Sequence, residues 1–183
     1  MLFLFLSLFA AAIVAVDQIT KYVTVMNIAP SNATMQTMQT LKDTFDLTTK
    51  KIEAMPTEVD AIPGLFQFSH YHNQGGAWSL FDGMMWLFIL AFAVLTVLIF
   101  IEYFKKPMGF SKFDRWCIAA IYAGGIGNMI DRIRLGFVVD MIKTQFIDFP
   151  IFNVADCFIT CGCIALMISL FFFNKEFWKE DKK

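Results

Sequence analysis

Four long apolar segments, separated by polar stretches, dominate the pattern of hydrophobic and polar positions along the chain. A helix needs roughly 20 residues to cross the ~30 Å hydrocarbon core of a bilayer. Each segment reaches that length once its flanks are included. The pattern therefore predicts an all-α membrane protein, a single domain over residues 1–183 with transmembrane helices at about 1–23, 84–104, 115–134 and 154–174.

The first apolar segment could alternatively be a cleaved signal peptide. Such a peptide has a basic region before its apolar core and a small-residue cleavage site after it. Here no basic residue precedes Lys21, and the apolar run continues directly into Asp17-Gln-Ile-Thr-Lys21. A retained helix is therefore the favoured interpretation.

Composition agrees with a membrane protein and excludes two other classes. Apolar residues make up 57% of the chain and charged residues 17%, whereas soluble domains have about 45–50% and about 25%. The net charge of −1 provides no basic field for binding nucleic acid. Disordered chains are poor in the apolar residues that are abundant here.

Basic residues predict the orientation of the four helices. They gather in the stretch 102–115 and in the tail 175–183, which lie on the same side if the chain crosses four times. The positive-inside rule makes that side cytoplasmic. Both termini are then cytoplasmic, and residues 24–83 and 131–156 lie on the outer side.

The first outer segment has two parts. Residues 27–60 are polar and show no strong periodicity. Leu65–Tyr71 alternates between apolar and polar residues after Pro63-Gly64, which predicts a β-strand.

The helix directions bring unusual polar residues to the outer ends of the helices. Charged side chains inside a membrane are costly and usually mark a functional cavity. We therefore expect a site at this level, built from Asp17, Lys21, Asn73, Asn128, Asp131, Arg132, Asp140, Asn153 and Asp156.

Several of these residues also have purely structural interpretations. Asp17 and Lys21 have i,i+4 spacing and can simply pair on one helix face. Asp131 and Arg134 can form an ion pair at a helix end, and Asp156 can cap the helix that it opens. Small residues spaced by four suggest close helix packing, at Ala120/Gly124 and Ala123/Gly127.

Histidines and cysteines give no strong metal or disulfide signal. His70 and His72 share one face of the predicted strand, but no acid cluster lies near them in sequence, so a metal site is disfavoured. The four cysteines lack CxxC spacing and are expected to be buried thiols: Cys117, Cys157, Cys161 and Cys163.

Asp140 and Asp156 are the strongest candidates for catalysis. Two carboxylates in a poorly solvated site repel, which raises the pKa of one so that the pair shares a proton. The ionised acid can take a proton from water while the neutral acid hydrogen-bonds a scissile carbonyl. This aspartic-protease chemistry requires no metal ion, cofactor or covalent nucleophile. On spacing alone, catalytic and structural roles both stay open.

Motifs containing these residues follow one another in a characteristic order: Asp17-Gln-Ile-Thr-Lys21, His72-Asn-Gln-Gly-Gly-Ala-Trp-Ser79, Gly124-Gly-Ile-Gly-Asn-Met-Ile-Asp-Arg132 with Gly136-Phe-Val-Val-Asp140, and Phe152-Asn-Val-Ala-Asp156. Together they resemble the bacterial lipoprotein signal peptidase family (signal peptidase II). The resemblance covers all four predicted helices and their outer connections.

The resemblance implies an intramembrane aspartyl endopeptidase of the bacterial inner membrane. Such an enzyme removes the signal peptide of a prolipoprotein just before a Cys that carries diacylglycerol. Its catalytic pair falls on Asp140 and Asp156. The residues that orient these acids and the substrate fall on Asn128, Arg132 and Asn153. Further supporting positions fall on Asp17, Lys21, Asn73 and Gly75.

The resemblance also implies a small strand-rich cradle on the outer side, after the first helix, and an active site near the outer leaflet. The expected partners are diacylated prolipoproteins and membrane lipid, and the protein is expected to be a monomer without cofactor or metal. Two departures stand out. Residues 27–60 look like an insertion, and Gly75-Gly76-Ala77-Trp78 replaces the family's commoner Gly-Ala-Ala-Phe, which affects the expected pocket shape.

Two other functions also fit acids in a membrane. An ion-coupled carrier places acids in a cavity, but its helices are usually broken near the midplane and arranged as repeats, and no repeat is visible here. A non-catalytic assembly subunit has no reason for two acids that are each accompanied by an Asn.

Overall fold

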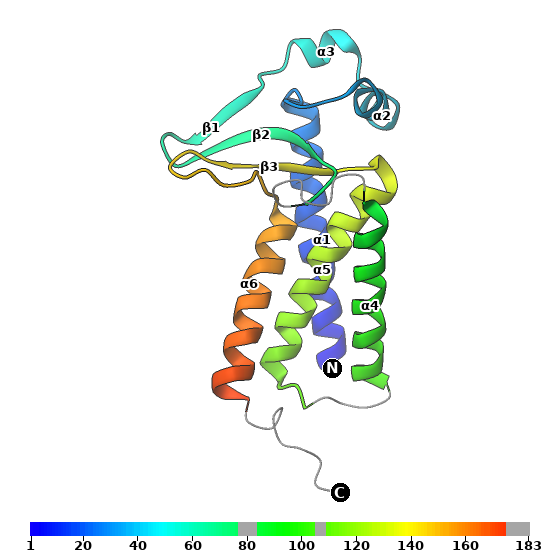
Figure 1. Ribbon diagram of the computed structural model, residues 1–183, viewed down its shortest axis with the longest axis vertical. Coiled ribbons are helices and arrows are strands. Elements are labelled where there is room, and N and C mark those ends of the chain that lie inside the picture. Colours follow the sequence, from blue (N-terminus) through cyan, green and yellow to red (C-terminus); the bar gives the residue numbers. More distant parts are fainter. Residues whose placement is uncertain (77–83, 105–108, 175–183) are drawn as a thin grey trace, which may run out of the picture.

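Four long helices stand side by side, with a small sheet across one end of the bundle (Figure 1). The computed structural model describes residues 1–76, 84–104 and 109–174. The helices are α1 (Leu2–Asn27), α4 (Met85–Phe104), α5 (Lys112–Leu135) and α6 (Val154–Ile168), which the π-helix η2 (Ser169–Phe173) continues. The N-terminus lies at the end of the bundle away from the sheet.

Three helices are long and apolar enough to cross a membrane in the part of the chain that the structure describes. They are Leu2–Asn27, Met85–Glu102 and Val154–Phe173. The remaining predicted span, 115–134, lies in α5, which has 24 residues and is about 36 Å long at 1.5 Å per residue. Because α5 packs against α1, α4 and α6, it carries small and polar residues instead of a lipid-facing apolar surface. Its crossing of the membrane stays a prediction.

The sheet has three antiparallel strands in the order β1 (Glu58–Ile62), β2 (Phe66–Asn73) and β3 (Val138–Thr144). The strand predicted at 65–71 corresponds to β2. Strand β3 was not predicted, because its first residues are buried on both faces and therefore do not alternate between apolar and polar positions. The prediction of a mostly helical protein with a small β-rich part is confirmed, although the third strand comes from after α5.

The polar segment 27–60 is folded, although its sequence shows no strong period. It forms α2 (Met35–Phe45) and α3 (Thr49–Glu53) before β1 begins. Thr34 accepts a hydrogen bond from the Thr37 backbone N–H and thereby starts α2, and Thr48 does the same for α3. We call residues 35–53 the α2–α3 cap. It lies on the side of the sheet away from the helices (Figure 1).

Small residues let α5 approach its neighbours closely, as predicted. A Cβ atom on Gly124 would lie 2.6 Å from the Ala155 backbone oxygen of α6. A Cβ atom on Gly127 would collide with the Asp17 carboxylate of α1. This close approach brings α1, α5 and α6 together at the level where their polar residues occur.

Candidate active site

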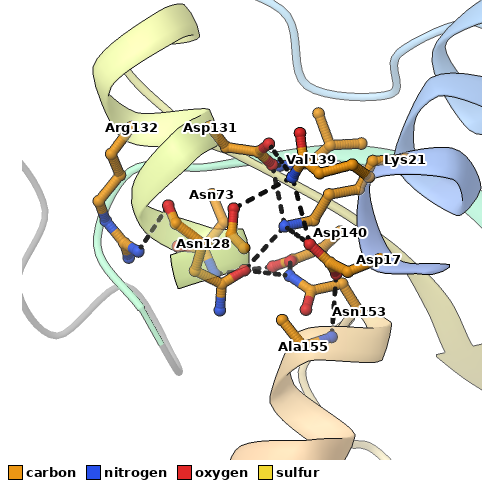
Figure 2. A network of polar contacts seen from close by, with 12 residues as sticks. Asp17, Lys21, Asn73, Asn128, Asp131, Arg132, Val139, Asp140, Asn153 and Ala155 are labelled. Atoms are coloured by element: carbon orange, nitrogen blue, oxygen red, sulfur yellow. Dashed lines mark hydrogen bonds and ion pairs between the residues drawn. The ribbon is translucent and has the colours of Figure 1, made fainter. Parts of the chain in front are cut away.

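Polar side chains from five elements meet beneath the sheet (Figure 2). Helix α1 contributes Asp17 and Lys21, α5 contributes Asn128, and α6 begins at the Asn153 cap. Strands β2 and β3 contribute the others. Every candidate residue named from the sequence and drawn there lies in this network or beside it: Asp17, Lys21, Asn73, Asn128, Arg132, Asp140 and Asn153.

Asp140 is held by two side-chain amides. Its Oδ2 accepts a hydrogen bond from Asn73 Nδ2 at 2.7 Å, and its Oδ1 accepts one from Asn153 Nδ2 at 2.6 Å. The residue is 1% exposed. Burial, followed by the nearby charge of Asp156, raises the pKa of the Asp140 carboxyl to about 7, although the two amide hydrogen bonds act in the opposite direction.

Asp156 lies in the first turn of α6 and is half-buried. Its Oδ2 accepts a hydrogen bond from the Asn153 backbone N–H at 3.1 Å, while Asn153 Oδ1 accepts one from the Asp156 N–H at 3.0 Å. This reciprocal pair is a capping box, so the structural interpretation of Asp156 is confirmed. The other carboxylate oxygen is free of that role and accepts from Asn128 Nδ2 at 2.8 Å.

Two asparagines connect the two acids. Asn153 Nδ2 donates to Asp140 and also to Asn128 Oδ1, at 3.0 Å. Asn128 Nδ2 then donates to Asp156. A continuous path of hydrogen bonds therefore runs from one carboxylate to the other, and it fixes the orientation of both.

Lys21 lies behind this path and contacts three partners. Its Nζ is 2.9 Å from Asp17 Oδ2, 3.1 Å from Asp131 Oδ2 and 2.9 Å from Asn128 Oδ1. An ammonium group has three protons to donate, and Lys21 is 3% exposed. The Asp17–Lys21 pair predicted from i,i+4 spacing is confirmed, and it forms part of a larger cluster.

Asp131, which the sequence places at the level of the site without giving it a catalytic role, lies in the cluster around Lys21. The alternative of a helix-end ion pair with Arg134 is wrong, since Asp131 faces Lys21 and the Arg134 guanidinium lies over the Phe45 ring at 4.7 Å. The sequence signal for its place in the site is the Gly124–Arg132 motif, in which it follows Asn128 by three residues and so lies on a neighbouring part of the helix surface. Gln18, which the sequence analysis did not select, donates to Asp131 Oδ1 at 3.1 Å.

The acidic members of this cluster hold the elements that carry Asp140 and Asp156. Asp17 Oδ1 accepts a hydrogen bond from the Ala155 backbone N–H at 2.9 Å, at the start of α6. Asp131 Oδ2 accepts one from the Val139 N–H at 3.0 Å, next to Asp140 in β3. The cluster therefore constrains the backbone on both sides of the acid pair.

Arg132 lies at the edge of the network and lines the same cavity as Asp140 and Asp156. Its guanidinium stacks over the Phe88 ring at 4.0 Å and makes a long 3.4 Å contact with the Asn128 carbonyl oxygen. Figure 2 shows it on the opposite side of α5 from Lys21. This charge faces the adjoining cavity.

The turn after β2 orients Asn73. Asn73 Oδ1 accepts hydrogen bonds from the backbone N–H groups of Gly75, at 3.1 Å, and Gly76, at 2.7 Å, so Nδ2 is free to point at Asp140. Gly76 has a φ of +70°, a conformation that favours glycine. Ala77 and Trp78, the rest of the unusual motif, lie outside the described residues.

A cavity of about 680 Å³ opens beside the acid pair. Asp140 and Asp156 form part of its wall together with Asn73, Asn128 and Arg132, while most of the remaining lining is apolar and comes from α4, α5, α6 and residues 149–152. An adjoining cavity of about 340 Å³ is more polar and includes Tyr71, Lys143 and Asp148. The two share Asn73, Gly76 and residues 149–151.

Comparison with known proteins identifies the family. A family model described as Signal peptidase (SPase) II matches residues 9–172. The chain belongs to the signal peptidase II family. It is 37% identical over 166 residues to the lipoprotein signal peptidase of Enterococcus faecalis, covering 89% of this chain and 85% of that protein. It is 41% identical over 120 residues to that of Streptococcus agalactiae serotype III, covering 66% and 73%.

Solved structures agree with the family. A bacterial membrane enzyme determined by the in meso method at 2.3 Å resolution superposes with a TM-score of 0.70 and 27% identity, covering 97% of this chain and 93% of that one. The predicted family is therefore confirmed, and with it a peptidase in a membrane. This membership argues against the carrier and the assembly subunit.

The two histidines of this signal peptidase lie close together on β2. His70 and His72 are buried, with their rings 4.9 Å apart, and burial lowers the pKa of His70 to about 4 and that of His72 to about 3. Among the described residues, no group of three or more His, Cys, Asp or Glu side chains could hold a metal ion.

The prediction of four buried thiols is wrong for Cys161, which is exposed and, with Cys157, lines the apolar cavity.

Proposed function

We propose that this signal peptidase removes the signal peptide of diacylglyceryl-modified prolipoproteins, cutting just before the lipidated Cys, with Asp140 and Asp156 activating water. The observation that carries this proposal is the hydrogen-bonded path Asp140–Asn153–Asn128–Asp156 in the wall of an apolar cavity. An acid pair facing an apolar space suits a reaction on an apolar peptide.

The chemistry follows from one proton shared between the two acids. Asp140, whose pKa is raised to about 7, is the neutral member and donates a hydrogen bond to the scissile carbonyl. Asp156 is the ionised member and takes a proton from the attacking water, whose oxygen bonds to the carbonyl carbon. The C–N bond then breaks, and a proton passes from the acids to the departing amine nitrogen.

The two cavities give the substrate a direction. The apolar cavity takes the end of the signal peptide and the acyl chains of the lipidated Cys, because its walls are the apolar faces of α4, α5 and α6. The polar cavity with Lys143 and Asp148 takes the chain that follows the Cys. Arg132 faces the first cavity, where its guanidinium can donate a hydrogen bond to a carbonyl oxygen of the substrate.

The proposed orientation of the chain in the bacterial inner membrane places the acid pair where a signal peptide ends. With α5 as the fourth span, both termini are cytoplasmic and the acid pair lies near the outer leaflet, where a signal peptide ends. Lys112 and Arg115 begin α5 at the end away from the site, in keeping with the positive-inside rule. Lys105, Lys106 and the lysines of the tail lie outside the described residues. A monomer suffices for this chemistry, because one chain supplies both acids and the asparagines that connect them.

Cleavage by the purified protein tests the reaction. A diacylated prolipoprotein should be shortened, and Asp140→Asn or Asp156→Asn should lower turnover by about 10²–10⁴-fold, because each removes a proton donor or a base. Asp43→Asn is the matched control, since Asp43 is an exposed acid of α2. Near-normal turnover by either site variant would contradict the assignment.

Thiol labelling tests the orientation. In a background without native cysteines, Asp60→Cys places a thiol in β1 and Lys112→Cys places one at the start of α5, and both native side chains are exposed. An impermeant reagent added outside intact spheroplasts should label position 60 and spare position 112. The reverse pattern would place the acids at the cytoplasmic face.

A further inference from the structure

Strand β3 separates the acid site from the α2–α3 cap. Successive side chains of a strand point to opposite faces. Val138 and Asp140 line the apolar cavity, whereas Val139 and Met141 belong to the apolar core beneath the cap. Each residue next to Asp140 in sequence is therefore buried on the other side of the strand, at 1% and 2% exposure.

The cap contributes the other half of that core. Leu41 of α2, Leu47 between the two helices and Ile52 of α3 are buried in the same cluster as Val139 and Met141. Leu41 is 1% exposed. The cluster is completed by residues at the ends of α1 and α5 and at the start of β3: Val25, Leu135 and Phe137.

Phe45 gives the cap a second contact, with the charged cluster. Its ring lies over the Arg134 guanidinium at 4.7 Å and 6.1 Å from the Tyr22 ring. It also lines a small recess that reaches Lys21 and Asp131. Lys21 and Asp131 are both buried, so Phe45 covers the side of this cluster that faces away from the apolar cavity.

β3 needs such support because it is an end strand of the sheet. In the described residues its ladder partner is β2, and on its other edge Met141 and Ile142 bond to Phe152. At Val139 the backbone N–H bonds to the Asp131 carboxylate. The cap therefore packs on the part of β3 around Val139, where β2 is the strand that pairs with β3.

We propose that the α2–α3 cap is a positioning element for catalysis, with Leu41 and Phe45 as its positioning residues. Leu41 fixes β3 from behind, and with it Asp140, while Phe45 keeps water from the Lys21–Asp131 contact. This inference rests on the proposed function, since it assigns the cap to the same acid pair. Neither residue touches the substrate.

Leu41→Ala and Phe45→Leu test the proposal in the full-length enzyme. A displacement of about 1 Å in a reacting group can cost about 10²-fold in rate, so we expect kcat to fall about 10–100-fold while KM for a diacylated prolipoprotein changes less than about twofold. Leu41→Met conserves volume and should restore kcat. Leu6→Ala is the matched control, because Leu6 is buried in α1 about 20 Å along the helix from Lys21.

The pH profile distinguishes positioning from general destabilisation. Loosening β3 admits water to Asp140, which lowers its pKa towards the ordinary value and moves the alkaline limb of kcat to lower pH. The charged groups that face Asp140 and contribute to this limb are Asp156 on α6, Lys21 and Asp17 on α1, and Asp131 and Arg132 on α5. They are unchanged in these variants.

The outcomes separate this inference from the proposed function. If Leu41→Ala does not fold, Phe45→Leu decides, because it leaves no large cavity. Wild-type kcat and an unshifted limb in the folded cap variants would overturn the inference, as would an equal loss in Leu6→Ala. If the wild-type enzyme itself cleaves no prolipoprotein, the proposed function fails, and the inference fails with it.

Discussion

Lys21 Nζ lies 2.9 Å from Asn128 Oδ1, and this contact links the buried charges to the acid pair. An ammonium group has protons to donate and no lone pair to accept, so the Asn128 oxygen must face Lys21. The amide nitrogen then points at Asp156, 2.8 Å away. Lys21 therefore sets the orientation of a side chain that it shares with the proposed base.

Neutralising the charged cluster should impair catalysis more than folding. Because Lys21 also contacts Asp131, changing the Asp17–Lys21 pair alone leaves a buried charge unpaired, which is strongly destabilising. The triple variant Asp17→Asn, Lys21→Met, Asp131→Asn avoids this. We expect it to insert and fold, with kcat lowered at least about tenfold, because Asn128 Oδ1 loses the Lys21 donor and keeps only that from Asn153.

The matched control for this variant is Glu102→Gln with Arg115→Met. It removes an ion pair of 3.1 Å between α4 and the start of α5, away from the site, and should leave kcat near that of the wild type. Full activity in the triple variant would show that Asp17 and Lys21 only form a structural ion pair on α1 and do not contribute to catalysis.

Turnover should fall as the pH rises above about 7. Burial and the Asp156 charge raise the pKa of Asp140 to about 7, so below this pH the acid pair holds its shared proton and above it the proton is lost. Without a proton donor, kcat should drop about tenfold per pH unit. The measurement is kcat from pH 5 to 9 for the wild type and for Asp43→Asn. A flat profile to pH 9 would contradict the shared proton.

Acid should destabilise the cap through His70 and His72. Burial lowers the pKa of these side chains to about 4 and about 3, whereas an unfolded histidine titrates near 6.5. Between pH 6.5 and 4 the unfolded chain therefore binds more protons than the folded chain, and the free energy of unfolding decreases as the pH falls. The loss is about 1.4 kcal/mol per histidine for each pH unit.

His72→Phe isolates this effect. Its ring stacks on Phe137 with centroids 4.0 Å apart, and phenylalanine can retain that stacking without titrating. Thermal unfolding or hydrogen exchange of the cap at pH 7 and pH 5 should show a smaller acid loss in the variant. Asp140 acts in the opposite direction, since its raised pKa gives stability that is lost as the pH rises from about 4 to 7, but it is common to both proteins. An equal acid loss in the two would exclude the histidine.

Gly127→Ala should disrupt the site, whereas Gly125→Ala should not. A methyl group on Gly127 would collide with the Asp17 carboxylate. Such overpacking typically costs about 1–3 kcal/mol, and we expect at least a tenfold loss of kcat. On Gly125 the methyl group would meet the Phe92 ring at 3.0 Å, and this side chain can move. Activity assays and thermal unfolding of both variants check the difference.

The sequence predicted the apolar helices well and the contacts of the site less well. The length of the apolar segments predicted α1, α4 and α6, because lipid-facing helices are apolar along their length. It missed β3, which is covered on both faces and does not alternate. It also missed α2, whose apolar residues Met38, Leu41 and Phe45 stand among Thr and Gln.

Individual partners were harder to predict than the residues themselves. The motifs carry Asp131, but spacing favoured Arg134 as its partner because both lie on one helix. The choice of Lys21 depends on how closely α1 and α5 approach at Gly127. Such a choice is made by tertiary packing, which local spacing does not encode.

The two faces of β3 make the chain length before Asp140 a constraint. Helix α5 ends at Leu135 and is capped by Gly136, which has a φ of +80°, and the Val139 backbone N–H is held by Asp131. One residue added between Gly136 and Asp140 would slip the strand register and exchange its faces. The Asp140 carboxylate would then be buried in the apolar core beneath Leu41, and a valine would occupy the position beside Asp156 where water is activated. Two added residues would restore the facing but move the acid about 6.6 Å along the strand. An insertion at the exposed Thr48–Thr49 turn between α2 and α3 would leave this alternation untouched.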